Sequence, residues 1–240
     1  MTISNGARAA LLALALVTNR GGVAHAADEP APAIAQGSGD GAPGSRPWQV
    51  AAGVRAALFR GRGYDPFSTN DAFTQFSATA TWAVATGRAL ATAVGVGWES
   101  GSADAQARGA DTNLSLTRLA LVLEERFAPR PWAFAFARVS PGWLRGTASL
   151  DDPAVAAPLR TTFSTFSFDA SAGAAARLNP RASRVGFWLV GDAGYGWAPD
   201  QHLALAPALS AADHDKAGAT TLADLAPRGV FLRFAVALAF

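Results

Sequence analysis

The sequence predicts an all-β protein: an eight-stranded antiparallel up-and-down transmembrane β-barrel, preceded by a signal peptide and a disordered linker. Three observations predict this fold. Apolar and polar residues alternate with a period of two in eight stretches, which is typical of strands with one buried face. The connections between these stretches are alternately long and short. Half of the residues are hydrophobic but only 16% are charged, whereas an average soluble domain carries roughly 25% charged residues.

The first 26 residues predict a secretory signal peptide. Arg8 supplies a positive charge, residues 9–17 form a short apolar run, and Ala24-His25-Ala26 is an A-x-A cleavage site. Removing residues 1–26 takes away two basic residues, Arg8 and Arg20, and no acidic one, so the 20 basic residues become 18 and equal the 18 acidic ones. The resulting net charge of zero means that the basic isoelectric point of the whole chain does not indicate a nucleic-acid partner.

Residues 27–47 predict a flexible periplasmic linker, because a segment so rich in Pro, Gly, Ala and Ser cannot bury enough apolar surface to order itself. The remaining residues, 48–240, are the predicted barrel. In its first stretch Val50 and Val54 share one face while Gln49 and Arg55 share the other. The eight alternating stretches are residues 48–59, 73–84, 89–98, 113–127, 132–144, 163–178, 185–197 and 228–240.

Two of these stretches are ambiguous. The segment 113–127 is rich in Leu, Glu and Arg, which also form helices, but its alternation and its neighbours favour a strand. In the segment 132–144 the aromatic residues Phe134 and Phe136 share their parity with Arg138, which places a charge on an aromatic face. A β-bulge near Arg138, or a break at Pro141-Gly142, would resolve that conflict.

The connections carry the most specific signal for a membrane barrel. Their lengths run about 13, 4, 14, 4, 18, 6 and 30 residues, the layout of tight turns at one end and long loops at the other. The strands are long enough, because about 9–11 tilted residues cross a bilayer. After the N-terminal segment no run of about 18 apolar residues follows, which argues against a helical multi-pass membrane protein.

An eight-stranded barrel has an interior just wide enough for side chains to fill it, so its inward residues must be small or paired. Gly and Ala at inward positions of the third, sixth and seventh stretches fit this constraint. Charges facing lipid would cost about 2–4 kcal/mol for Arg at the midplane, which favours inward placement. We therefore expect an internal ion-pair network, and no wide water channel, from Arg55, Arg118, Glu124, Asp169, Arg177, Asp192 and Arg233.

Five tryptophans lie close to predicted strand ends, where they would form part of an aromatic girdle at the membrane interfaces. They are Trp48, Trp82, Trp98, Trp132 and Trp197. The last stretch ends the chain on an aromatic residue, and three apolar residues precede it at matching parity. These four positions are Phe234, Val236, Leu238 and Phe240.

With these features the chain resembles the small eight-stranded outer-membrane β-barrels of Gram-negative bacteria, of the outer membrane protein A and outer membrane protein W types. The resemblance covers residues 48–240 and rests on the signal peptide, the strands, the loop layout and Phe240. It implies that both termini and the short turns face the periplasm and that the long loops face outward. It also implies two partners, the outer-membrane lipid and the barrel assembly machinery, which would read the four C-terminal positions as an assembly signal. It transfers no catalytic or ligand-binding residue, and its usual tyrosines are nearly absent here.

Little in the sequence points to chemistry. There is no cysteine, and the three histidines are His25, His202 and His214. A G-x-S-x-G nucleophile motif is absent. Asp213-His214-Asp215 is better interpreted as a solvated loop tip than as a cation site, because it lacks an EF-hand pattern. We expect no catalytic residue, no metal and no cofactor.

The functional hypothesis is therefore a non-enzymatic outer-membrane β-barrel with a structural or surface-interaction role, exposing four long loops to a surface ligand that the sequence does not identify. One alternative is a narrow pore for small or apolar solutes, which would need a continuous polar path. Another is a soluble periplasmic lipocalin-like barrel, whose Val, Leu and Phe faces would point inward. A lipid-modifying barrel enzyme using His202 or His214 is the third.

Overall fold

The computed structural model describes residues 46–59, 61–87, 89–107, 109–151, 158–179, 185–207 and 220–240. The predicted signal peptide, residues 1–26, and nearly all of the predicted linker lie outside these residues. Within the described ranges, no helix has the length and apolar character needed to cross a membrane.

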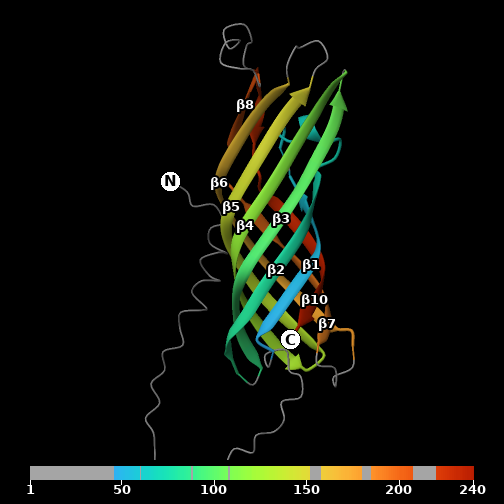
Figure 1. Ribbon diagram of the computed structural model, residues 1–240, viewed down its shortest axis with the longest axis vertical. Helices are drawn as coiled ribbons and strands as arrows, with labels where there is room; N and C mark the ends of the chain where they lie inside the picture. Colours follow the sequence, from blue (N-terminus) through green and yellow to red (C-terminus); the bar gives the residue numbers. More distant parts are fainter. Residues whose placement is uncertain are drawn as a thin grey trace, which may run out of the picture. The chain divides into compact units, whose positions relative to one another are not determined.

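Eight strands pair in sequence order into a closed antiparallel ring, in which the first strand pairs with the last (Figure 1). The predicted fold is thereby confirmed. The ring consists of β1 (Trp48–Leu58), β2 (Ala72–Thr86), β3 (Leu90–Ala107), β4 (Ala110–Arg130), β5 (Ala133–Asp151), β6 (Leu159–Arg177), β7 (Gly186–Trp197) and β10 (Gly229–Ala239).

The two ambiguous stretches are both regular strands. The segment that could have been helical is the interior of β4. The expected bulge near Arg138, or break at Pro141-Gly142, is wrong, because β5 pairs with β6 in one continuous register from Ala133 to Leu150. Phe134, Phe136 and Arg138 are all buried inside the ring. The aromatic face of β5 is therefore its inner face, and the charge belongs there.

The strand register fixes how steeply the strands are tilted. A path that starts at Trp48 and steps from each residue to its partner on the next strand passes through Trp82 and Val94 and reaches Val230 on β10. In the β1–β10 register, the position on β1 opposite Val230 is residue 58. One circuit thus moves from position 48 to position 58. For eight strands this stagger corresponds to a tilt of about 40°, given about 3.3 Å per residue and about 4.8 Å between strands. Each residue then advances about 2.5 Å along the barrel axis.

The barrel wall is not equally high all around. We call the end at which β1 begins and β10 ends the turn end, and the opposite end the loop end. β3, β4, β5 and β6 rise well beyond the other four strands of the ring at the loop end (Figure 1). The predicted long loops after positions 98 and 144 are therefore largely wrong. β3 continues to Ala107, β4 already begins at Ala110, and β5 continues to Asp151. In these extensions the outward residues are polar and the inward ones are small or apolar. The alternation of apolar and polar residues on which the strand prediction rests is therefore weaker there.

The connections at the loop end close the barrel there. The segment between β1 and β2 contains a short 3-10 helix, η1 (Asp65–Phe67). The segment between β7 and β10 contains a hairpin of β8 (Gln201–Pro207) and β9 (Thr220–Leu225), and β8 pairs with the end of β6. Together they bury a cluster that we call the apolar cap: Ala57, Phe59, Tyr64, Phe67, Phe73, Leu114, Leu116, Leu144, Ala148, Leu159, Ala198, Leu203, Leu205, Leu225 and Phe231.

The outward face of the ring is apolar between two rows of exposed aromatic residues. On β7 the rows are marked by Phe187 and Trp197, whose ten-residue separation corresponds to about 25 Å along the axis. The turn-end row consists of Trp48, Trp82, Phe127, Trp132, Phe187 and Phe240. The loop-end row consists of Phe76, Trp98, Trp143, Phe166, Tyr195 and Trp197. Among described outward residues between the rows, Glu125 alone is charged, and Thr92 donates a hydrogen bond to it (2.7 Å).

Closure of the ring can be tested with a disulfide between the first and last strands. Ala52 lies directly opposite Val236 in the β1–β10 register. The double variant Ala52→Cys/Val236→Cys should cross-link on mild oxidation, because directly opposed residues have Cα atoms within disulfide reach. The natural chain has no cysteine to interfere.

The product would be measured as faster migration of the unfolded, non-reduced protein on a gel. Ala52→Cys/Phe240→Cys, in which the second position is four residues out of register, is the matched control and should not cross-link. Absence of a cross-link in the opposed pair would contradict the closed ring.

Candidate functional site

The inside of the barrel is filled by a continuous network of buried charges that we call the ionic column. Every strand of the ring contributes to it, β2 through the polar side chains Gln75 and Thr81. The charged members are Arg55, Glu99, Arg118, Glu124, Arg126, Arg138, Asp169, Asp192 and Arg233.

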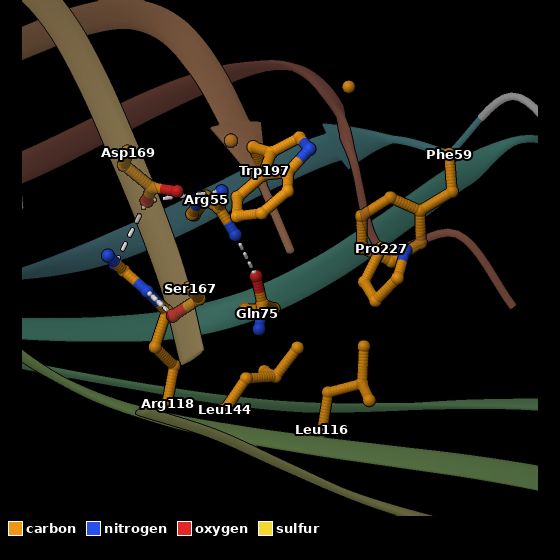
Figure 2. Close-up of a pocket in the computed structure, with 12 residues that line it drawn as sticks. Arg55, Phe59, Gln75, Leu116, Arg118, Leu144, Ser167, Asp169, Trp197 and Pro227 are labelled. Atoms are coloured by element: carbon orange, nitrogen blue, oxygen red, sulfur yellow. Dashed lines mark hydrogen bonds and ion pairs between the residues drawn. The ribbon is translucent and has the colours of Figure 1, made fainter. Parts of the chain in front are cut away.

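At its loop end the column is a four-membered cluster of two arginines and two acids. Arg55 lies 3.3 Å from Asp169 and 3.6 Å from Glu99, and Arg118 lies 2.9 Å from Asp169 and 3.3 Å from Glu99. Arg118 also donates to Ser167 Oγ (2.9 Å), so its guanidinium is held in one orientation (Figure 2). Each carboxylate therefore bridges two cations, an arrangement that offsets the cost of burying them.

The middle of the column links this cluster to the turn end. Arg233 Nη2 contacts Glu99 Oε1 at 2.9 Å, and its Nη1 contacts Asp192 Oδ2 at 3.7 Å. Asp192 in turn lies 3.2 Å from Arg138. Arg233 and Asp192 face each other across the β10–β7 pair, so strand register alone brings these opposite charges together.

The turn-end part of the column centres on Glu124. Its Oε2 accepts a hydrogen bond from Arg138 Nε (2.7 Å), and its Oε1 accepts one from Arg126 Nε (2.6 Å). Arg126 also donates to Thr81 Oγ1 (2.9 Å). The two arginines stack on lumenal rings, Arg138 over Phe136 and Arg126 over Phe134. Glu124 is thus fully buried between two arginines, each of which is backed by an aromatic ring.

Apolar side chains close the lumen on both sides of the column. At the loop end Phe231 of the apolar cap lies against Arg55, with 4.3 Å between the guanidinium carbon and the ring centroid. At the turn end the closing residues, which we call the turn-end cluster, are Ala51, Phe134, Phe136, Ala175, Trp188, Val190, Ala235, Ala237 and Ala239. A solute crossing the lumen would have to pass both apolar clusters and separate the ion pairs between them.

A small cavity lies between the apolar cap and the ionic column. Its volume is about 20 Å³, which is room for about one water molecule. Figure 2 shows its polar wall, with Arg55, Gln75 and Asp169, facing Leu116 and Leu144 of the apolar cap. A cavity of this size does not open a path along the barrel.

Glycines make the room that the column needs. A Cβ placed on Gly196 would lie 2.8 Å from Asp169 Oδ1 and 2.9 Å from Arg55 Nη2. A Cβ on Gly173 would lie 2.6 Å from the Asp192 side chain. The absence of a side chain at these two inward positions lets the ion pairs form in a narrow lumen.

The structure brings together six of the seven charges expected inside the barrel and adds three. Arg177 lies half-buried at the turn end of β6, where its Nε donates to Asn179 Oδ1 (3.2 Å). The additional members, Glu99, Arg126 and Arg138, all have inward parity. Glu99 follows the last residue of the predicted third stretch, and for Arg138 the sequence suggests a bulge nearby or a break at Pro141-Gly142. Extending the alternation of Gly95 and Gly97 by two residues would have found Glu99.

The predicted interfacial tryptophans and the C-terminal apolar residues all lie on the outside of the barrel. Trp48, Trp82 and Trp132 belong to the turn-end row, and Trp98 and Trp197 belong to the loop-end row. Phe234, Val236, Leu238 and Phe240 all lie on the outward face, exposed.

The candidate catalytic and cation-binding residues do not form a site in the described part of the chain. His202 lies on the exposed β8–β9 hairpin, where its Nδ1 is 2.7 Å from Asp224 Oδ1. His214 and the whole Asp213-His214-Asp215 triplet fall outside the described residues, as does His25. Among the residues that the structure describes, no three acidic or histidine side chains are grouped to hold a metal ion.

Tyr64 of the apolar cap lies in the connection between β1 and β2, outside the ring. Burial raises the pKa of its phenol above the usual value, so the hydroxyl stays neutral. It donates to the Ala72 carbonyl at 3.2 Å and thereby ties the β1–β2 connection to the start of β2.

Comparisons with known proteins give structural neighbours only. No protein-family model matches the chain, and no curated protein does so either. Two crystal structures of Ail, the attachment invasion locus protein of Yersinia pestis, are similar at 11% sequence identity, covering 81% of this chain and 97% of that one. The TM-scores are 0.42 for Ail alone and 0.43 for Ail in complex with the heparin analogue sucrose octasulfate. The assignment of the fold rests on the strand pairing described above.

The importance of the ionic column can be measured with a charge-removing substitution. Glu99→Gln keeps the side-chain shape but leaves Arg55, Arg118 and Arg233 without their shared counter-charge. Removing one partner of a buried ion pair costs about 3–5 kcal/mol, so the urea midpoint of the refolded barrel in detergent micelles should fall clearly. Glu125→Gln, an exposed carboxylate on the outward face, is the matched control and should leave the midpoint nearly unchanged. Equal midpoints for both variants would show that the column does not stabilise the barrel.

Proposed function

We propose that this chain is a non-enzymatic β-barrel of the bacterial outer membrane, closed to solutes, with a structural or surface-interaction role. One observation carries the proposal: a band of apolar residues, bounded by two aromatic rows, surrounds a lumen filled with paired charges. An outward apolar band about 25 Å tall between aromatic girdles is the surface that a bilayer requires of a barrel. Ring closure also pairs the backbone polar groups that lipid cannot satisfy.

The lumen favours a closed barrel over the narrow pore considered from the sequence. A pore needs a continuous polar path, and here the apolar cap and the turn-end cluster interrupt any such path. Between them the ionic column is held by paired contacts from eight strands. The protein would therefore act through its surface rather than by conducting solutes.

The direction of the side chains also separates this proposal from a lipocalin-like barrel. A soluble ligand-binding barrel would point its Val, Leu and Phe residues inward around a cavity. In this chain Val54, Leu121 and Phe234 point outward and are 51%, 66% and 64% exposed. So much exposed apolar surface is suited to lipid and not to water.

The proposal includes an orientation and two assembly partners. The turn end, with the short connections and Phe240, would face the periplasm, and the raised strands of the loop end would face the exterior. The predicted signal peptide would direct export, and the barrel assembly machinery would read the C-terminal strand. Phe234, Val236, Leu238 and Phe240 share the exposed outward face, which supports their role as that signal.

The membrane band can be tested with two arginine substitutions on the same face of β4. Leu121→Arg places a charge in the middle of the apolar band, where it costs about 2–4 kcal/mol. It should greatly reduce the amount of protein in the outer-membrane fraction. On a gel of unboiled samples, it should also reduce the band of folded protein whose mobility changes on boiling.

Ser115→Arg is the matched control, because it lies on the same face of β4 beyond the loop-end row. It should assemble like the wild type. Wild-type assembly of both variants, or a soluble periplasmic wild type without a mobility shift, would contradict the proposed membrane band.

Closure of the lumen has its own measurement. The purified protein, folded as judged by its heat-dependent mobility, should give no stepwise current in a planar lipid bilayer. Steady open-channel conductance from the folded wild type would contradict the closed state and favour the pore. A variant of the column such as Glu99→Gln shows whether any current that appears passes through the lumen.

A further inference from the structure

The ionic column contains one more positive than negative charge. Its members are five arginines and four acids, and all of them are buried. Arg177, half-buried at the turn end of β6, adds to this excess and does not offset it. Arginine does not lose its proton in proteins, so the excess is permanent. Because a buried charge without a counter-charge is costly, a lumen that encloses one is expected to take up a counter-ion.

Part of the excess charge lies beside the small cavity between the apolar cap and the ionic column. Arg55, Arg118 and Asp169 all line this cavity (Figure 2). Asp169 is already shared, because its Oδ2 lies 3.3 Å from Arg55 and 2.9 Å from Arg118. The other acid that contacts these two arginines, Glu99, also contacts Arg233. The wall of the cavity, with two cations and one anion, therefore carries a net charge of +1.

Hydrogen-bond donors without an acceptor line the same cavity. No described residue accepts a hydrogen bond from Nε of Arg55, although this side chain is buried. Gln75, also buried, accepts from Arg55 Nη1 through its amide oxygen, which leaves its amide nitrogen as a pure donor. That nitrogen has no partner among the described residues, and Figure 2 shows it directed away from Arg55, toward Leu144. Ser167 adds a third donor, because its Oγ accepts from Arg118 Nε and its own proton is left to donate.

The two other buried atoms without a hydrogen-bond partner do not need an ion. They are Arg233 Nε and Asp192 Oδ1, one donor and one acceptor. Their residues are directly opposed in the β10–β7 register, so a single bridging water can satisfy both atoms. Arg55 is instead opposed by Gln75 and by Arg233, and neither of them offers a free acceptor. This difference distinguishes the cavity from the rest of the column.

The size and the wall of the cavity limit what could balance the charge. Its volume of about 20 Å³ is too small for polyatomic anions such as phosphate, sulfate or a carboxylate. Opposite the donors its wall is apolar, with Phe59, Leu116 and Leu144. A halide ion is little larger than a water molecule and accepts hydrogen bonds from any direction. A water molecule would also accept from these donors, and would donate to Asp169, but it would leave the net charge uncompensated.

We propose that this cavity binds one chloride ion, which accepts hydrogen bonds from Arg55 Nε, the Gln75 amide and the Ser167 hydroxyl. The ion completes the charge balance of the ionic column. Because its three donors come from β1, β2 and β6, it links these strands beneath the apolar cap and stabilises the folded barrel without passing through it. The site does not depend on the proposed orientation of the barrel in the membrane.

The experiment compares the full mature chain refolded in detergent micelles with sodium chloride and with sodium methanesulfonate, whose anion is too large for the cavity. Total salt is held constant, and each salt is present from the start of refolding because the apolar cap covers the cavity. Chloride should raise the urea midpoint of the wild type. Above the dissociation constant of the site, a tenfold increase in chloride should raise the folding equilibrium constant about tenfold, as for one ion that binds only the folded state. Equal midpoints in the two salts would overturn the proposal.

Gln75→Glu tests the charge balance at this cavity. It places a carboxylate beside Arg55 and gives the column as many acids as arginines. In methanesulfonate its urea midpoint should equal or exceed that of the wild type, and chloride should no longer raise it. Gln106→Glu adds the same charge at an exposed position of β3 and is the matched control, which should keep the chloride response of the wild type. A full chloride response in Gln75→Glu, or its loss in Gln106→Glu, would contradict the site.

The position of the ion can be determined in crystals grown with sodium bromide, because bromide gives an anomalous X-ray signal. The wild type should show an anomalous peak within hydrogen-bond distance of Arg55 Nε and Gln75 Nε2, and Gln75→Glu should lack it. Ordered water without an anomalous signal at this place in the wild type would show that a neutral molecule fills the cavity, and the proposal would then be wrong.

Discussion

The structure depends on how a narrow lumen is filled. Eight strands tilted by about 40° leave an interior just wide enough for side chains to fill, and voids there would weaken the packing. This chain fills it with five arginines and four acids, and some of their pairs are set by the strand register while others cross the lumen. Arg233 and Asp192, and likewise Glu99 and Arg118, are direct cross-strand neighbours. Because each carboxylate bridges two or more cations, every strand is tied to others beyond its own neighbours. Rigidity of the wall and closure of the lumen thus have the same origin.

The same constraint gives the two faces of the barrel wall different residue types. Residues of one parity face the lumen and must be polar or small, while residues of the other parity face outward and are free to be apolar. Above the loop-end aromatic row this division changes. The inward residues Leu114 and Leu116 become apolar and form the cap, while the outward residues Ser115 and Thr117 become hydroxyl-bearing. The inversion of polarity along β4 is what a strand requires when it passes from lipid into water.

This inversion explains how much the sequence could predict. The eight strands and their inward and outward faces follow from the period-two pattern, which is strongest where one face meets lipid. The extensions of β3 to β6 fall in segments that the sequence predicts as loops, because Ser, Asp, Gln and Ala outside the bilayer give little contrast between the two faces. The β8–β9 hairpin is not predicted either, because its strands are only seven and six residues long and lie within the longest connection. For Arg138 the sequence suggests a bulge or a break because this residue shares an aromatic face with Phe134 and Phe136, whereas in the structure both rings stack under arginines inside the barrel. Aromatic residues in such a barrel therefore do not all face outward, because some of them stack against arginine guanidinium groups in the lumen.

The most direct test of this account is a spin-label scan along residues 113–127 of β4 in reconstituted vesicles. One label at a time would be measured for access to oxygen, which concentrates in lipid, and to a water-soluble nickel chelate. The account predicts high oxygen access at positions 119, 121 and 123, low access to both reagents at the alternate positions, and a change to nickel access at 113 and 115. Uniform nickel access along the strand, or the absence of a two-residue period, would contradict a closed barrel that spans the bilayer.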